Sequence, residues 1–137
     1  MIMGKYFKPL RRKIGVVTLV VACVCALSLS WLNWQARTPN VDAATAELLQ
    51  LKADDWWQNG RRTVSIPKKD WTDALRRLNP QTVTVNQEGV YVQFGSLIVE
   101  SWGLFILPKG SAFQPKSGTD PSFQLIHDRV FKFEIKG

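Results

Sequence analysis

His127 is the only histidine of this 137-residue chain, and histidine is the side chain most often used for acid–base chemistry. Asp128 follows it directly, and a neighbouring carboxylate can orient a catalytic imidazole. Consecutive residues on a strand point to opposite faces, so these two side chains would meet only at a turn. No cysteine occurs after Cys25 to serve as a nucleophile. We therefore expect a structural or exposed histidine, and the alternative is a small exported hydrolase or transferase with its site around His127.

Other sequence motifs that support catalysis are absent. The chain contains no G-x-S-x-G, Walker, H-E-x-x-H or EF-hand pattern. The paired acids Asp54 and Asp55 lie near a predicted helix end, and Asp70 and Asp73 are typical charges of a helix start. We therefore predict no catalytic residue, no cofactor and no metal site, and we do not expect an enzyme.

The positive charge of the chain is concentrated at its start. The formal net charge is +7, and residues 1–13 contribute +5 because they hold five bases and no acid. Residues 38–137 hold 12 bases and 11 acids, so this part is nearly neutral. A nucleic-acid-binding domain needs its bases on the surface that meets the phosphates. The charge distribution therefore argues against a nucleic-acid partner.

A long apolar run follows the basic residues. Of the 19 residues from Ile14 to Leu32, 15 are apolar, and no charged residue appears before Arg37. A helix of this length spans about 28 Å, close to the roughly 30 Å of bilayer hydrocarbon. The pattern predicts a transmembrane signal anchor over residues 14–36, with residues 1–13 as a cytoplasmic tail. It also predicts a single-pass protein of the cell inner membrane, with its C-terminal domain outside the cytoplasm.

Two other interpretations of this run remain open. A cleaved signal peptide has a similar charged start and apolar middle, but its apolar part is usually shorter, at about 7 to 15 residues. The stretch Val20-Val21-Ala22-Cys23 loosely resembles a lipobox, with Cys23 as the lipidated residue. The apolar run continues past Cys23 where a polar tether is expected, so a retained anchor is favoured over both.

Tryptophan and arginine flank the predicted anchor in a pattern typical of a membrane interface, where amphipathic indoles and headgroup-binding bases gather. Core packing is the competing interpretation for the adjacent tryptophans of the next segment, because these rings offer a large apolar area. Besides the lipid bilayer, the expected partner is a membrane or periplasmic protein. The candidate membrane-interface residues are Trp31, Trp34, Trp56, Trp57, Arg61 and Arg62.

Residues 37–59 read as a juxtamembrane linker and helix. Asp42 can cap a helix from Ala43 to about Gln58, and Asn59-Gly60 ends it. A second helix is predicted from Asp70 to about Leu78, with Trp71 and the apolar residues three, four and seven positions later on one face. A short strand at residues 63–66 precedes it.

The remaining sequence is typical of antiparallel strands. Alternating valines on both sides of residues 86–89 predict a β-hairpin, and a bulge or bend is expected at Gly95. Residues 97–100 continue extended, Ser101-Trp102 is the predicted second turn, and residues 103–107 form another strand. An irregular loop over residues 109–122 leads to strands at 123–126 and 130–135, the last with one solvent-exposed face.

Together these elements predict an α+β fold. It consists of an N-terminal transmembrane helix, a juxtamembrane helix and an antiparallel β-meander packed against one helix. Residues 60–137 are the predicted extracytoplasmic domain. The expected function is a membrane-anchored protein that presents this small, non-catalytic binding or accessory domain.

Overall fold

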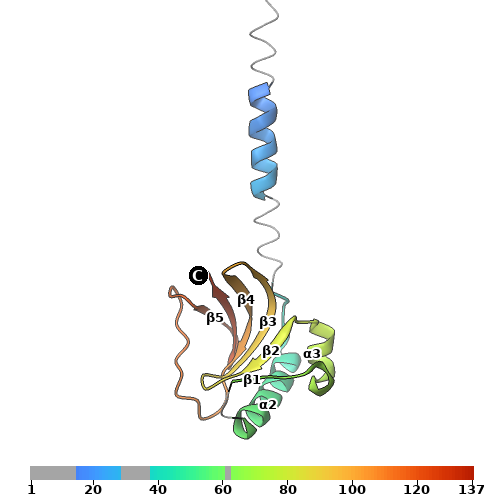
Figure 1. Cartoon of the computed structure of the whole chain (residues 1–137), viewed down its shortest axis with the longest axis vertical. Coiled ribbons are helices and arrows are strands. Elements are labelled where there is room, and N and C mark those ends of the chain that lie inside the picture. Colours follow the sequence, from blue (N-terminus) through green and yellow to red (C-terminus); the bar gives the residue numbers. More distant parts are fainter. Residues whose placement is uncertain (1–14, 29–37, 61–62) are drawn as a thin grey trace, which may run out of the picture. The chain divides into compact units, whose positions relative to one another are not determined.

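The computed structural model describes residues 15–28, 38–60 and 63–137, and divides the chain into two compact units. The first unit is Met1–Ala36 and the second is Arg37–Gly137 (Figure 1). Every buried apolar residue in the described segments belongs to the second unit, from Ala46 to Phe133. The second unit therefore has a complete core of its own, as expected for a part of a chain that folds independently.

In the first unit, residues 15–28 form a helix whose residues are all exposed. Across residues 15–28, 38–60 and 63–137, no helix combines the length and the apolar character needed to cross a membrane. This finding contradicts the predicted anchor over residues 14–36 and the single-pass inner-membrane localisation. The flanks of the predicted anchor, residue 14 and residues 29–36, lie outside the described residues.

The second unit is built on a six-stranded, fully antiparallel sheet with the order β1-β2-β3-β4-β6-β5. This confirms the predicted α+β character. The strands are β1 (Val64–Ser65), β2 (Thr82–Val85), β3 (Val90–Leu97), β4 (Glu100–Ile106), β5 (Ser122–His127) and β6 (Val130–Ile135). The helices are α2 (Ala43–Asn59), the 3₁₀ helix η1 (Lys68–Asp70) and α3 (Asp73–Leu78).

Helix α2 begins and ends where its local sequence predicts. The Asp42 carboxylate accepts a hydrogen bond from the Thr45 N–H, which satisfies a free donor of the first turn, and Gly60 is the C-cap. Its buried residues are Ala46, Leu49, Gln50 and Ala53, which recur at the spacing of one helix face. Because this face is part of the core, α2 lies inside the second unit.

Helix α3 begins later than predicted. Thr72 is the N-cap, and its hydroxyl accepts from the Leu75 N–H, so the α-helix starts at Asp73 rather than at Asp70. Residues 68–70 form η1, which turns the chain before α3. Trp71 lies between the two helices, and its indole N–H donates to the Ile66 carbonyl at 3.0 Å.

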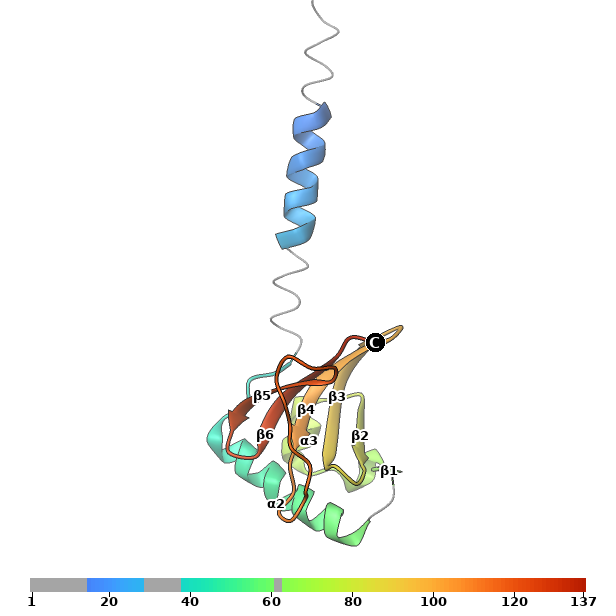
Figure 2. The ribbon, with the colours of Figure 1, turned by 90° about the vertical axis from the view of Figure 1, so that its left-hand side faces the viewer.

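The two faces of the sheet are covered by different layers (Figures 1 and 2). Helices α2 and α3 pack on one face, where valines of β2 and β3 meet Leu104 and Ile106 of β4. On the other face, the long loop between β4 and β5, which we call the strap (residues 107–121), crosses the sheet. Phe113 of the strap packs on an aromatic cluster formed by Tyr91, Phe105, Phe123, Phe131 and Phe133. Both faces of the central strands are therefore covered. On the predicted solvent-exposed face of β6, Val130 is buried, whereas Lys132 and Glu134 are half-buried.

Hydrogen bonds hold the strap along the edge of the sheet. The Lys116 carbonyl accepts from the Phe123 N–H at 2.9 Å, on the edge strand β5. The Asp120 carboxylate accepts from the backbone N–H groups of Lys136 and Gly137. A strand edge with unpaired backbone groups invites pairing with another chain, so the strap also shields the first part of β5.

Trp71→Ala should be among the most damaging single changes in the second unit. The side chain is buried, and its loss removes a large apolar area from the junction of α3 and the sheet. We expect the free energy of unfolding to fall by about 3 to 5 kcal/mol, measured by urea denaturation of residues 37–137. Trp71→Phe, which keeps a ring but loses the hydrogen bond to Ile66, should cost clearly less. Equal losses for the two variants would contradict a core role for the indole.

Candidate functional site

The structure describes two of the six predicted interface residues. Trp31, Trp34, Arg61 and Arg62 lie outside the described residues. Trp56 and Trp57 are half-buried and pack against the helix-side core, in agreement with the packing interpretation. The Trp57 indole N–H donates to the Gln87 carbonyl, and the Lys52 ammonium lies 5.4 Å from the centre of the Trp56 ring. Their contact with lipid stays a prediction.

His127 is exposed at the end of β5, where it pairs with Val130 of β6. Asp128 begins the turn with a left-handed backbone (φ 46°), and its carboxylate lies 3.9 Å from Nε of Arg129. Among the described residues, no hydrogen bond joins the imidazole to a carboxylate or hydroxyl, and no group of three or more potential ligands could hold a metal ion. The alternative of an enzyme centred on His127 stays a prediction.

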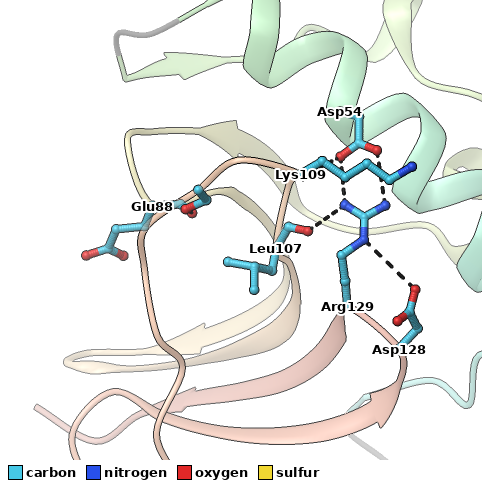
Figure 3. Close-up of polar contacts among 7 residues, drawn as sticks. Asp54, Glu88, Leu107, Lys109, Asp128 and Arg129 are labelled. Carbon is cyan, nitrogen blue, oxygen red and sulfur yellow. Dashed lines mark hydrogen bonds and ion pairs between the residues drawn. The ribbon is translucent and has the colours of Figure 1, made fainter.

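Two largely buried charged groups form an ion pair between α2 and the β5–β6 turn (Figure 3). Arg129 donates from Nη1 and Nη2 to the two carboxylate oxygens of Asp54, at 2.8 and 3.0 Å. Asp54 also accepts from the Lys109 N–H at 2.9 Å, and Arg129 donates to the Leu107 carbonyl. The side chains are only 13% and 19% exposed. This bidentate pair fixes the start of the strap against α2.

Enclosed charges can indicate an active site, so the titration of this pair matters. Partial burial alone would raise the pKa of Asp54, but the Arg129 guanidinium and the Lys109 N–H outweigh burial and hold this pKa below its ordinary value. The carboxylate is thus kept charged, with its oxygens bonded inside the protein. This arrangement is typical of a structural link rather than of a general acid or base.

Tyr91 is the second enclosed titratable group. Its hydroxyl donates to the Glu88 carboxylate, and its ring packs against Phe105 and Phe133. Burial raises the pKa of Tyr91 well above its ordinary value, and the hydrogen bond and charge of Glu88 add to this effect. The Glu88 carbonyl also accepts from the Ser111 hydroxyl of the strap. The phenol therefore stays protonated and holds Glu88 of the β2–β3 turn, and Glu88 in turn bonds to the strap.

The β3–β4 hairpin carries the most unusual surface of the second unit. Strand pairing continues to Leu97 and Glu100, so Ile98 and Val99 alone form the turn. Leu97 and Val99 are 54% and 62% exposed, and Ile98 is fully exposed. We call Leu97, Ile98 and Val99 the apolar tip. In Figure 2 this hairpin extends beyond the neighbouring strands, beside the C-terminal residue.

The backbone at the apolar tip is as unusual as its exposure. Ile98 has φ 51°, in the left-handed region where two-residue hairpin turns normally place Gly, Asn or Asp. A β-branched side chain is strained in this region, at a cost of about 1 to 3 kcal/mol. Strain and exposed apolar area at one point mark a functional candidate, because neither stabilises the free domain.

Sequence reasoning missed the apolar tip because its turn lacks the usual turn residues. The predicted turn at Ser101-Trp102 is wrong, since both residues lie within β4. Trp102 instead packs on Gly95 of β3, where a Cβ atom would lie 2.1 Å from the indole ring. This contact and the register shift between Gln93 and Gly95 fix the hairpin so that the turn falls at Ile98. The three consecutive aliphatic residues were the only available signal.

Searches against protein-family models, curated proteins and solved structures gave no match for this chain. The candidate site therefore rests on its own geometry.

Replacing Asp54 should expose the structural role of the ion pair. Asp54→Asn leaves the Arg129 guanidinium largely enclosed without its counter-charge, and the free energy of unfolding should fall by about 3 kcal/mol at neutral pH. Because the folded pKa of Asp54 is lowered, its contribution is present above the unfolded pKa and is lost as the pH falls through the folded pKa, below about pH 4. The difference between variant and wild type should therefore shrink in acid.

Asp55→Asn is the matched control for this measurement. Asp55 is the neighbouring carboxylate and is more exposed, and its salt bridge to Lys52 lies on the surface of α2. We expect its effect to stay within about 0.5 kcal/mol. Similar losses from both substitutions in urea denaturation would argue against a special role for Asp54.

A substitution at the apolar tip should raise the free energy of unfolding, whereas the substitution of Asp54 lowers it. Asparagine tolerates a left-handed backbone, so Ile98→Asn should raise the free energy of unfolding by about 1 kcal/mol. Thermal and urea denaturation of residues 37–137 measure the change. Leu125→Asn is the control, because Leu125 is 58% exposed without a left-handed backbone and should give no gain. A clear loss of stability from Ile98→Asn would show that Ile98 serves the fold.

Proposed function

We propose that residues 37–137 form a non-catalytic binding domain whose contact surface is the apolar tip. The observation that carries this proposal is the fully exposed Ile98, held in a left-handed backbone between two other exposed aliphatic residues. The free domain bears both the strain and the hydration cost of this arrangement. A partner that covers the tip would offset both, since burying an aliphatic side chain is favourable by about 1.5 to 3 kcal/mol.

The free energy gained by burying the apolar tip limits the affinity that the tip can give alone. Two of the three side chains of the tip are already partly covered in the free domain. Complete burial of all three would therefore contribute roughly 3 to 6 kcal/mol in total. Association itself costs about 4 kcal/mol or more. The tip therefore acts as an anchor that needs further contacts around it, and we expect micromolar rather than nanomolar affinity.

The non-catalytic part of the proposal is supported by how the polar groups are used. Asp54, Arg129, Tyr91 and Glu88 are bonded to one another or to the strap, in the part of the chain that the structure describes. Their hydrogen bonds hold elements together, keep the Asp54 carboxyl charged by lowering its pKa, and keep the Tyr91 phenol protonated by raising its pKa. Exposed His127, at the end of β5, makes no hydrogen bond to any of these four described residues.

Photo-crosslinking in the cells that express the gene tests the contact surface. A photoreactive residue at Ser96, which is exposed and pairs with Ser101 beside the tip, leaves Ile98 intact. The full chain should give a discrete adduct from this position. The same residue at Leu48, an exposed position on α2, is the control and should not give that adduct.

Two substitutions complete the test of function. Ile98→Asn should remove the adduct although the domain remains folded, because the substitution is expected to stabilise the free domain. His127→Ala should leave both the adduct and the cellular phenotype unchanged. If no adduct forms at Ser96, or if it persists with Ile98→Asn, the apolar tip is not the contact surface. A loss of phenotype of about 10²-fold or more with His127→Ala would favour the enzyme instead.

A further inference from the structure

Resting on the proposed function, we infer that the partner of the apolar tip is a protein with a preformed apolar pocket, into which Ile98 inserts as a rigid anchor. The inference concerns the chemistry and shape of the partner. It follows from how firmly the tip is held and from which charges are missing around it.

Three features restrict the tip to one conformation. Antiparallel pairing of β3 with β4 runs without interruption from Gly95 to the turn, so the hairpin leaves no flexible loop. The side chain of Ile98 is β-branched and therefore restricted in χ1. The backbone of Gly137 lies against Val99, since a Cβ atom on Gly137 would be 2.6 Å from the Val99 Cβ. Contact with a partner would thus require little further ordering.

A rigid tip favours binding to a partner whose pocket matches its shape. A preorganised anchor lowers the entropy cost of binding to a pocket whose walls match it. Fluid lipid hydrocarbon accepts apolar side chains of any shape, so a strained backbone would gain nothing there over a relaxed hairpin with the same apolar area. The left-handed Ile98 therefore favours a protein pocket over a bilayer.

The charges near the tip point the same way. From Gln93 to Gly103 the single charged residue is Glu100, an acid. On the adjacent strand, β6 ends at Ile135 opposite Ser101, and Lys136 is the single base that follows it. Surfaces that dock on anionic lipid carry several Lys or Arg residues close together. Glu134, opposite Trp102, and Asp120, whose carboxylate accepts from the Lys136 and Gly137 N–H groups, add two acids. Acids therefore outnumber bases around the tip, which disfavours docking on anionic lipid.

Ile98→Leu separates shape from apolar area. Leucine has the same number of carbons, so partition into lipid hydrocarbon should be unchanged, whereas a fitted pocket should discriminate by up to about tenfold. Mass spectrometry of the Ser96 adduct identifies the crosslinked polypeptide. The Kd of that polypeptide for the full chain is then compared between wild type and Ile98→Leu, and we expect a three- to tenfold weakening.

Vesicles provide the complementary measurement. Residues 37–137 are mixed with phosphatidylcholine vesicles, with and without phosphatidylglycerol, and assayed by flotation. We expect no flotation of wild type or Ile98→Leu. Flotation that is lost with Ile98→Asn, together with an unchanged Kd for Ile98→Leu, would overturn the pocket while the tip remained the contact surface. An adduct that survives Ile98→Asn would instead overturn the proposed function itself.

Discussion

The second unit depends on the ion pair between Asp54 and Arg129. Asp54 belongs to helix α2, and its carboxylate accepts N–H groups that lie 55 and 75 residues further along the chain. One side chain thus joins the first helix, the start of the strap and the β5–β6 turn. Because the pair is largely enclosed, either partner alone would be costly to leave in place. The pair therefore specifies how the helical layer and the strap enclose the sheet.

The other layers follow from this link. With its N-terminal end capped by Asp42 and its Asp54 held in place, α2 presents Ala46, Leu49 and Ala53 to the sheet. The strap, bound at Lys109, places Phe113 on the aromatic face. The sheet is covered on both faces, and its strand β5 is shielded at Phe123 by Lys116. Among the described residues, the turn that joins β3 and β4 is one part of this sheet that the layers leave exposed.

The contrast between the body of the second unit and the apolar tip supports a division of roles. Enclosed charges and aromatic rings stabilise the body, where no buried side-chain nitrogen or oxygen of the described residues lacks a hydrogen-bond partner. The apolar tip does the reverse, because exposed aliphatic area and a strained Ile98 both lower the stability of the free domain. Proteins retain such costs where a ligand or partner compensates them. The rest of the second unit is stabilised without the tip, so the unit can remain folded despite the free-energy cost of the tip.

Local sequence determined the elements whose signals are local. Asp42 and Gly60 delimit α2, and the alternation around residues 86–89 and 130–135 gives strands, because caps and side-chain period act within a few residues. Distant contacts decided the rest. Asp54 of α2 meets Arg129 of the β5–β6 turn only in the folded chain, and the turn at Ile98 accompanies the packing of Trp102 on Gly95 across the hairpin. A local pattern cannot encode such pairings, because their free energy arises only when separate segments meet.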